Sequence, residues 1–295
     1  MNRSGSQHRR RPGRLPMSRR WAHWVGRNLA RWHYARHVEP TWLEVNRLRI
    51  PVRDLPAAFD GFRIVHLTDL HIGPKLASAY LDEAIDCALA EQPDVIALTG
   101  DYIHKGYRHL GRAAHGVGRL RAPHGVFAVL GNHDYSVRNA LGIRRHRGLH
   151  RAVAEALHAA GARVLRNETI ALRRGHSVVD LAGVDDLWSR DCDLDAAYRS
   201  HDAARPRVLL AHNPRTVERL DGRRCDLMLS GHTHGGQVVW PGLGRVALGR
   251  RARALAAGLY RFDQSYVYVN KGVGFGWRIR FGARPEVAVL TLTRA

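Results

Sequence analysis

Two histidines flanked by glycines occur in the segment GHTHGGQ at residues 231–237. The segment directly follows a short apolar run at 227–229, which predicts a buried strand. Two imidazoles separated by one residue converge on a single point only if the backbone bends, and the flanking glycines permit that bend. His232 and His234 therefore indicate a metal-binding loop at a strand end. For this motif taken alone, an ordinary surface loop is the alternative.

Four more apolar runs end in side chains that bind metals. The strands predicted at 62–67, 95–98, 126–130 and 208–211 are followed by carboxylates, imidazoles and an amide, namely Asp69, His71, Asp101, Asn132, His133 and His212. Taken singly, Asp69 and Asp101 are equally well explained as helix N-caps, and His212 as an ordinary loop histidine. Ligand-type residues at five strand ends of one chain are improbable by chance, so we interpret them as one site.

No thiolate belongs to this set, which favours hard or borderline divalent ions over copper(I) or iron–sulfur clusters. Eight ligand-type residues exceed what a single tetrahedral ion uses. They suit two ions roughly 3.5–4 Å apart that share a bridging carboxylate. We expect two divalent ions as cofactors, with manganese as the first choice and iron, zinc or magnesium as alternatives.

The elements that position these loops alternate between strands and helices. A helix is predicted at 76–91, and further strands are predicted at 43–50, 177–184, 266–269 and 287–292. Alternation of this kind, with polar residues just past the strand ends, predicts an α/β fold with its site at the carboxyl edge of a sheet. An arginine-rich excursion at 138–151 stands apart. Its arginines either grip a second phosphate or a nucleotide, or belong to a solvated loop.

Positive charge dominates the chain of 295 residues, since 47 Lys and Arg oppose 26 Asp and Glu and give a net charge of +21. This balance predicts attraction to something anionic, such as nucleic acid, a phospholipid surface or a phosphorylated substrate. Residues 1–38 contain ten arginines and no acid. Within them, the Arg-, Ser-, Gly- and Pro-rich stretch 1–16 is expected to be disordered.

A helix with an aromatic face is predicted at residues 17–37. Trp21, Trp24 and Trp32 share one face of this helix, and arginines line its flank. This composition is typical of helices that lie among lipid headgroups, so we expect residues 17–37 to bind an anionic membrane surface. Packing on the protein's own core and binding to nucleic acid are the alternatives.

The chain has three widely separated cysteines, Cys87, Cys192 and Cys225. They predict neither a disulfide framework nor a zinc ribbon, and they suit a reducing compartment. The Ser-Arg-Arg sequence at 18–20 resembles a twin-arginine export signal, but His23 and Arg27 interrupt the apolar region that should follow. We therefore expect a cytoplasmic protein, attached peripherally to the inner face of the membrane when it binds lipid.

In order along the chain, these motifs resemble those of the calcineurin-like metallophosphoesterases: Asp69-x-His71, Gly100-Asp101, Gly131-Asn132-His133-Asp134, His212 and Gly231-His232-Thr233-His234. The resemblance covers roughly residues 45–295. Three details are similar to one bacterial branch of the family: Ala182-Gly183-Val184-Asp185-Asp186, Gly235-Gly236-Gln237 and Arg284-Pro285-Glu286. That branch contains small phosphodiesterases and enzymes that cleave UDP-2,3-diacylglucosamine in lipid A biosynthesis.

The resemblance implies a four-layer α/β/β/α sandwich with two mixed sheets and a dinuclear metal site at the strand ends. It divides the chain into a basic arm, 1–40, and a metallophosphoesterase domain, 41–295. It also implies ligand sets, with Asp69, His71 and His234 on the first metal and Asn132, His212 and His232 on the second. Asp101 would bridge both ions. His133 would face the substrate as the catalytic acid, with Asp134 fixing its orientation.

The function that this resemblance implies is metal-dependent hydrolysis of a phosphodiester or pyrophosphate. A lipid-linked substrate such as UDP-2,3-diacylglucosamine, cleaved at a membrane surface, is the specific expectation. A nuclease or cyclic-nucleotide phosphodiesterase is the first alternative. A non-catalytic metal-binding scaffold is the second, and it is disfavoured because degenerate scaffolds usually lose a ligand or the acid histidine, whereas none is lost here.

Overall fold

The computed structural model describes residues 17–199, 202–245 and 248–295. The stretch 1–16, which we expected to be disordered, lies outside the described residues. Within the described ranges, every helix is too short or too polar to cross a bilayer.

Six strands form the first sheet, in the order β1-β14-β2-β3-β4-β5. Their bounds are Glu44–Val52 (β1), Glu286–Arg294 (β14), Arg63–Leu67 (β2), Val95–Thr99 (β3), Val126–Val129 (β4) and Arg163–Val164 (β5). β2 to β5 run parallel and β14 is antiparallel to β2, so the sheet is mixed. β1 continues through Pro51, beyond the predicted end, because it is an edge strand where a residue without an N–H is tolerated.

A second six-stranded sheet has the order β12-β13-β9-β8-β7-β6. Its strands are Gly258–Phe262 (β12), Ser265–Val269 (β13), Leu227–Ser230 (β9), Arg207–Leu210 (β8), Ser177–Gly183 (β7) and Glu168–Arg174 (β6). The four inner strands are parallel and the two edge strands are antiparallel to their neighbours, so this sheet is also mixed. The predicted strands are all present, whereas β5, β6, β12 and the short antiparallel pair Val239–Trp240 (β10) and Gly244–Arg245 (β11) were not predicted.

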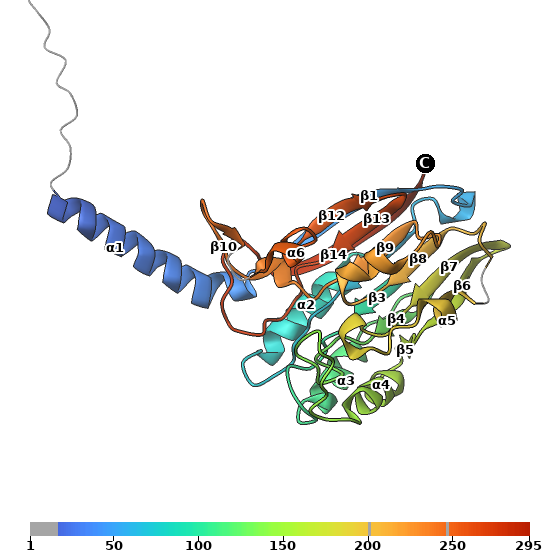
Figure 1. Ribbon diagram of the computed structural model, residues 1–295, viewed down its shortest axis with the longest axis horizontal. Coiled ribbons are helices and arrows are strands. Elements are labelled where there is room, and N and C mark those ends of the chain that lie inside the picture. Colours follow the sequence, from blue (N-terminus) through green and yellow to red (C-terminus); the bar gives the residue numbers. More distant parts are fainter. Residues whose placement is uncertain (1–16, 200–201, 246–247) are drawn as a thin grey trace, which may run out of the picture.

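Three hydrophobic clusters order the elements into layers. One cluster joins the first sheet to its three longer helices, Ser78–Ala90 (α2), Leu110–Val117 (α3) and Leu149–Ala159 (α4). The second cluster fills the space between the two sheets, and the third packs the outer face of the second sheet against short helices, including Leu194–Tyr198 (α5). Adjacent residues of β2 show the alternation, since Val65 belongs to the first cluster and Ile64 to the second. The protein is thus the predicted α/β fold with two mixed sheets (Figure 1).

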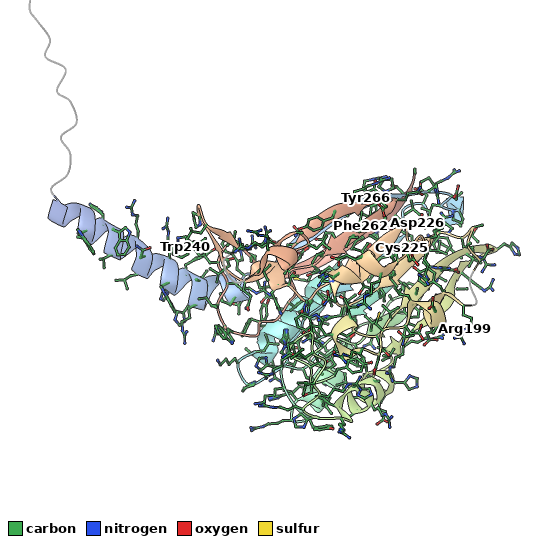
Figure 2. All side chains as sticks on the ribbon, viewed as in Figure 1. Arg199, Cys225, Asp226, Trp240, Phe262 and Tyr266 are labelled. Carbon is green, nitrogen blue, oxygen red and sulfur yellow. The ribbon has the colours of Figure 1, made fainter. Side chains whose placement is uncertain are left out.

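The helix Met17–His33 (α1) extends away from the two sheets (Figure 1). Trp21, Trp24 and Trp32 are 64%, 55% and 56% exposed, so the alternative in which this helix packs on the protein's own core is wrong. Figure 2 shows Trp240 close to the end of α1 that joins the body, where the Arg31 guanidinium lies 5.7 Å from its ring centroid.

The chain becomes packed immediately after α1. The turns Tyr34–Val38 (η1) and Glu39–Thr41 (η2) contact the loop that precedes β14. The Arg280 amide donates to the Ala35 carbonyl at 2.8 Å, and the Ala283 amide donates to the buried Glu39 carboxylate at 2.6 Å. Contacts with the body of the protein therefore begin within η1, and the division into an arm, 1–40, and a domain, 41–295, stays a prediction.

Candidate metal centre

The candidate ligands lie in loops where the two sheets meet. Loops that follow adjacent parallel strands are tied together, as where the Asp69 amide donates to the Gly100 carbonyl at 2.9 Å. Other bonds cross between the sheets: the His232 amide donates to Asp69 Oδ2 at 2.9 Å, and His212 Nδ1 lies 2.7 Å from the Thr99 carbonyl oxygen. The sheets thus bring together ligand-type residues that are more than a hundred positions apart in the sequence.

Asp69, His71 and His234 form the first donor group. The two Nε2 atoms lie 2.9 Å apart, and Asp69 Oδ1 lies 3.3 Å from His234 Nε2 and 3.6 Å from His71 Nε2. Asp69 Oδ1 is buried without a hydrogen-bond partner among the described residues. A buried carboxylate oxygen that faces two imidazole nitrogens is the arrangement that a divalent ion would satisfy.

Asn132, His212 and His232 form the second donor group. Asn132 Oδ1 lies 2.8 Å from His232 Nδ1 and 3.2 Å from His212 Nε2. Because the Thr99 carbonyl can only accept, Nδ1 of His212 carries a proton, and Nε2 is the ring nitrogen directed toward this group. An outer hydrogen bond of this kind commonly orients a metal-binding histidine.

Asp101 connects the two groups, since its Oδ2 lies 3.4 Å from both His71 Nε2 and His212 Nε2. Its other oxygen accepts the His133 amide at 2.8 Å. Although burial opposes ionisation of Asp101, neighbouring imidazoles such as His212 hold its pKa well below the usual range. Burial disfavours the imidazolium of His212, yet Asp101 and Asp69 raise its pKa well above the ordinary value. The buried carboxylates thus attract positive charge, which two divalent cations would supply.

The backbone of this region is strained at the donor residues. Five of them have positive φ angles: Asp69 (52°), His71 (44°), Asp101 (56°), His232 (71°) and His234 (52°). Each such conformation costs roughly 1–3 kcal/mol, and strain of this kind clusters at functional sites. The neighbouring glycines permit close approach: a Cβ on Gly231 would lie 2.2 Å from Asp69 Oδ2, and one on Gly131 would lie 2.2 Å from Asp101 Oδ1.

Sequence comparisons agree with this geometry. The family model described as calcineurin-like phosphoesterase matches residues 62–236. The chain belongs to this family. It is 32% identical over 265 residues to the uncharacterized metallophosphoesterase YkuE of Bacillus subtilis, and the aligned region covers 88% of each chain.

Two further relatives carry activities in their names. Phosphodiesterase YaeI of Escherichia coli is 32% identical over 260 residues, and the UDP-2,3-diacylglucosamine pyrophosphatase LpxG of Chlamydia trachomatis is 30% identical over 303 residues. Each comparison covers 88% of this chain and 92% of the relative. The metallophosphoesterase is therefore a phosphoester hydrolase, and its family uses a dinuclear divalent metal site, for which the two donor groups are suited.

The orientation of His133 in this metallophosphoesterase differs from our expectation. Its Nδ1 donates to the His104 carbonyl at 2.8 Å, and its ring centroid lies 4.7 Å from that of His71. Asp134, which we expected to fix this ring, instead accepts the amides of Asp101, Gly131 and Tyr102 at 2.8, 2.9 and 3.1 Å. A buried carboxylate can satisfy several amides at once, so Asp134 fastens together the loops that carry Asp101 and Asn132.

His104 is a residue of the site that the sequence interpretation missed. Its ring centroid lies 5.8 Å from that of His133 and 5.9 Å from that of His71. Burial, followed by the nearby charges of His71, His133, Arg138 and Lys75, lowers the pKa of His104 to about 4. This edge of the site is therefore cationic. A histidine three positions after the Gly-Asp motif was the available signal.

Trp188 and Asp186 were also missed, because the contacts that place them are with residues far away in the sequence. Trp188 packs on His232 in an edge-to-face contact, with the two ring centroids 4.4 Å apart. The turn Leu187–Ser189 (η4) is capped by Asp186, which accepts the amides of Trp188 and Ser189 at 2.8 and 3.0 Å. Burial raises the pKa of Asp186 to about 6.

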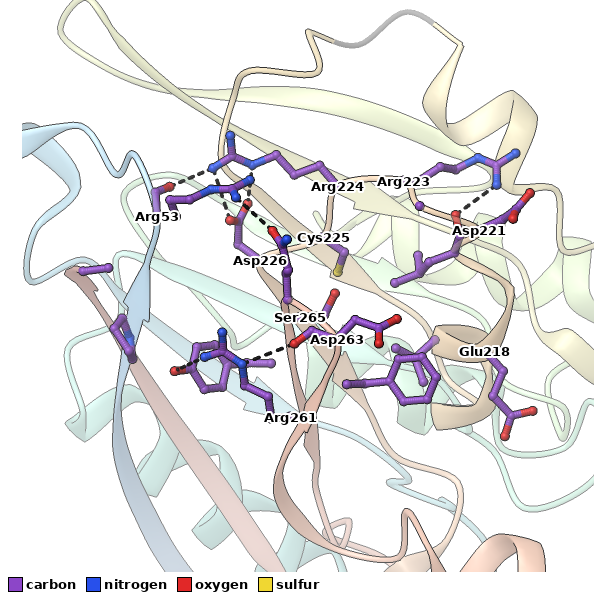
Figure 3. Close-up of a pocket in the computed structure, with 18 residues that line it drawn as sticks. Arg53, Glu218, Asp221, Arg223, Arg224, Cys225, Asp226, Arg261, Asp263 and Ser265 are labelled. Carbon is purple, nitrogen blue, oxygen red and sulfur yellow. Dashed lines mark hydrogen bonds and ion pairs between the residues drawn. The ribbon is translucent and has the colours of Figure 1, made fainter.

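A cavity of about 810 Å³ lies at the opposite ends of the strands of the second sheet (Figure 3). Arginines and carboxylates on its wall are paired with each other, as where Arg224 donates to Asp226 at 2.9 Å and to Asp54 at 3.2 Å. Asp226 precedes β9, whereas His232 and His234 follow it. This cavity is therefore remote from the candidate metal centre and does not contribute to its chemistry.

Proposed function

We propose that this protein is a dinuclear-metal-dependent phosphodiesterase or pyrophosphatase that acts on a lipid-linked substrate at a membrane surface. The observation that carries the hydrolytic part is the position of Asp101, whose Oδ2 lies 3.4 Å from one histidine of each donor group. A carboxylate shared between two groups of three donors is the arrangement of a two-metal hydrolase.

Seven residues would hold the two ions: Asp69, His71 and His234 on one side, Asn132, His212 and His232 on the other, and Asp101 between them. Their oxygen and nitrogen donors suit manganese, our first choice, and also iron, zinc or magnesium. When bound, two such ions lower the pKa of water and neutralise the charge that develops on the phosphoryl oxygens.

His133 would donate a proton to the oxygen of the leaving group. Because its Nδ1 donates to the His104 carbonyl, Nε2 is the nitrogen available to substrate. In hydrolysis, the oxygen of water adds to phosphorus, the bond from phosphorus to the leaving oxygen breaks, and that oxygen takes up a proton. Burial lowers the pKa of His133, which makes its protonated ring a stronger acid toward the leaving oxygen.

Two features support a lipid-linked substrate. The relative LpxG is named as a UDP-2,3-diacylglucosamine pyrophosphatase, and the region similar to this chain covers 92% of its length. The exposed tryptophans of α1 lie beside arginines in a segment without acids, which is the composition of a helix that binds anionic headgroups. We therefore propose that the enzyme acts as a peripheral protein on the cytoplasmic face of the membrane.

Product analysis by mass spectrometry tests this proposal. The purified protein with Mn²⁺ is given UDP-2,3-diacylglucosamine in detergent micelles, with bis-p-nitrophenyl phosphate, single-stranded DNA and a cyclic nucleotide in parallel. We expect UMP and a lipid phosphate. Cleavage of bis-p-nitrophenyl phosphate without cleavage of the lipid would refute the substrate class. Preferential cleavage of a nucleic acid or cyclic nucleotide would favour the alternative, and failure on every substrate would refute the hydrolytic function.

A further inference from the structure

A second, smaller cavity adjoins the candidate metal centre. It has a volume of about 390 Å³, within the range typical of small-molecule pockets, and the apolar side chains of Trp188, Pro214, Ala252 and Leu255 line it. Ala252 belongs to the short helix Arg250–Arg253 (α6), and Leu255 is buried directly after that helix. We call this cavity the Trp188 pocket.

The Trp188 pocket is continuous with the second donor group. His232 lines the pocket, and Nδ1 of the same ring lies 2.8 Å from Asn132 Oδ1. The ring of Trp188, which also lines the pocket, packs on this imidazole. A phosphoester whose phosphorus lies at the donor groups would therefore have one of its substituents within reach of the pocket.

One lining residue, Arg250, is exposed and charged, whereas the other polar side chains in the pocket are largely engaged within the protein. Asn213 Oδ1 accepts the Arg215 amide at 3.1 Å, and the Thr233 hydroxyl donates to the Ala256 carbonyl. The Arg215 guanidinium donates to Glu218. A nucleobase would bury donors and acceptors here with few partners, which costs free energy, whereas an alkyl chain requires none.

The surroundings of His71, in the first donor group, are cationic rather than apolar. There His104 lies beside His71 and His133, and the positive charges of Arg138 and Lys75 act on it. The two ends of the site thus differ, with an apolar pocket beside His232 and cationic side chains near His71. This asymmetry suits an amphiphilic substrate whose charged part and apolar part leave the phosphorus in different directions.

We propose that the Trp188 pocket binds an alkyl or acyl chain carried by one substituent of the phosphoryl group that is hydrolysed. This inference rests on the proposed function and deepens it, because it assigns the apolar part of the substrate to particular residues. The pocket is held open before substrate arrives: Asp186 caps the turn that carries Trp188, and Arg144 donates to the Ser189 carbonyl of the same turn at 2.9 Å.

Hydrolysis of a homologous series tests the pocket. The substrates are methyl, butyl and octyl p-nitrophenyl phosphate, used with the Mn²⁺-loaded full chain at concentrations below micelle formation. A methylene that is fully removed from water is worth up to about fourfold in affinity. We expect kcat/KM to rise at least about tenfold from methyl to octyl, and an absence of chain-length dependence would overturn the proposal.

A matched pair of variants locates the effect. Ala252→Trp fills the pocket from its wall, and Ala254→Trp makes the same change at an exposed position two residues away. We expect Ala252→Trp to lower the octyl-to-methyl ratio of kcat/KM at least about fivefold and Ala254→Trp to leave that ratio unchanged. Equal ratios in the two variants would show that the chain binds elsewhere.

Two further measurements distinguish failure of the pocket proposal from failure of the proposed function. Titration calorimetry with octylphosphonate and methylphosphonate reports binding without turnover, and a preference for octylphosphonate that Ala252→Trp removes supports the pocket even if no ester is hydrolysed. In that case the proposed function fails and the pocket stands. Thymidine 5′-p-nitrophenyl phosphate tests whether the pocket binds a nucleobase instead of an alkyl chain. If its kcat/KM exceeds that of the octyl ester and falls in Ala252→Trp, the pocket binds a base and the proposal is wrong.

Discussion

At the scale of single residues, Asp101 is the side chain on which both donor groups depend. We expect Asp101→Asn to reduce Mn²⁺ stoichiometry from two ions to at most one and to lower kcat on bis-p-nitrophenyl phosphate by about 10²–10³-fold or more, because a neutral amide bridges two cations poorly. Calorimetric titration with Mn²⁺ measures the stoichiometry.

The control for Asp101→Asn is Asp221→Asn, the same change at an exposed position beside the remote cavity. It should retain both metal binding and turnover. If Asp101→Asn still binds two ions with unchanged affinity, Asp101 is not the bridging ligand.

His133 and His104 allow a test of how the catalytic ring is oriented. His133→Ala should keep both ions and lower kcat by roughly 10²–10⁴-fold, since only the acid is lost. His104→Ala retains the backbone carbonyl that accepts from His133 Nδ1. We therefore expect it to lower kcat less than about tenfold. Steady-state kinetics on bis-p-nitrophenyl phosphate measure both, and an equal loss in the two variants would assign a direct role to the His104 imidazole.

The candidate ligands could be predicted from the sequence because residue type and position after an apolar run are both local properties. The roles of Asp134 and Trp188 could not. The Asp134 carboxylate accepts hydrogen bonds from backbone amides, and those amides belong to two different loops. Trp188 acquires its position through a contact with His232, which is 44 positions away. Such contacts exist only after the sheets have paired.

At the scale of elements, the strands that were predicted differ in pattern from those that were missed. β3 and β9 are buried along their whole length, so they are continuous apolar runs. β12 is an edge strand whose residues alternate between exposed and half-buried positions, and β6 is an edge strand with charged residues at its ends. Their pairing comes from the neighbouring strand rather than from their own hydrophobicity.

The arginine-rich segment 138–151 proves to be partly structural. Arg144 is half-buried, donates to the Ser189 carbonyl and to Asp191 at 2.9 and 2.6 Å, and lies 5.0 Å from the centroid of the Tyr135 ring. We expect Arg144→Met to lower the free energy of unfolding by about 1–3 kcal/mol, since the change leaves a carbonyl and a carboxylate without their donor. Urea denaturation measures this.

Arg147→Met is the matched control for Arg144→Met, because Arg147 is an exposed arginine of the same segment. It should change the free energy of unfolding by no more than about 0.5 kcal/mol. Equal effects of the two substitutions would mean that the contacts of Arg144 contribute nothing measurable.

At the scale of the whole molecule, the mixed α/β fold and the family could be predicted from the motif set, whereas the polarity of the site could not. The apolar pocket beside His232 combines residues from three separate segments, around Trp188, Pro214 and Leu255. The cationic end combines Lys75 and Arg138, whose charges act on His104, from two others. Neither group has a sequence pattern of its own, because each is produced by the way in which the two sheets pack.

The same scale includes the surface that would carry the enzyme to its substrate. α1 exposes Trp21, Trp24 and Trp32, and contacts with the body of the protein begin after it, within η1. We predict that the full chain carrying Trp21→Ser, Trp24→Ser and Trp32→Ser will bind phosphatidylserine-containing vesicles at least about tenfold more weakly than the wild type, because indole rings anchor a helix in the headgroup layer. Cosedimentation measures the affinity, and hydrolysis of bis-p-nitrophenyl phosphate should not change.

His23→Ser serves as the control, since His23 is an exposed aromatic residue of the same helix that the proposal does not use. Salt separates the contributions further. Attraction of arginines to an anionic surface contributes about 1 kcal/mol per residue to the binding free energy, and added salt screens it. The contribution from tryptophan burial does not weaken as salt is added. If the triple variant binds vesicles as tightly as the wild type, α1 is not the membrane anchor. If the wild type then binds single-stranded DNA with a steep dependence on salt, the basic arm is a nucleic-acid element instead.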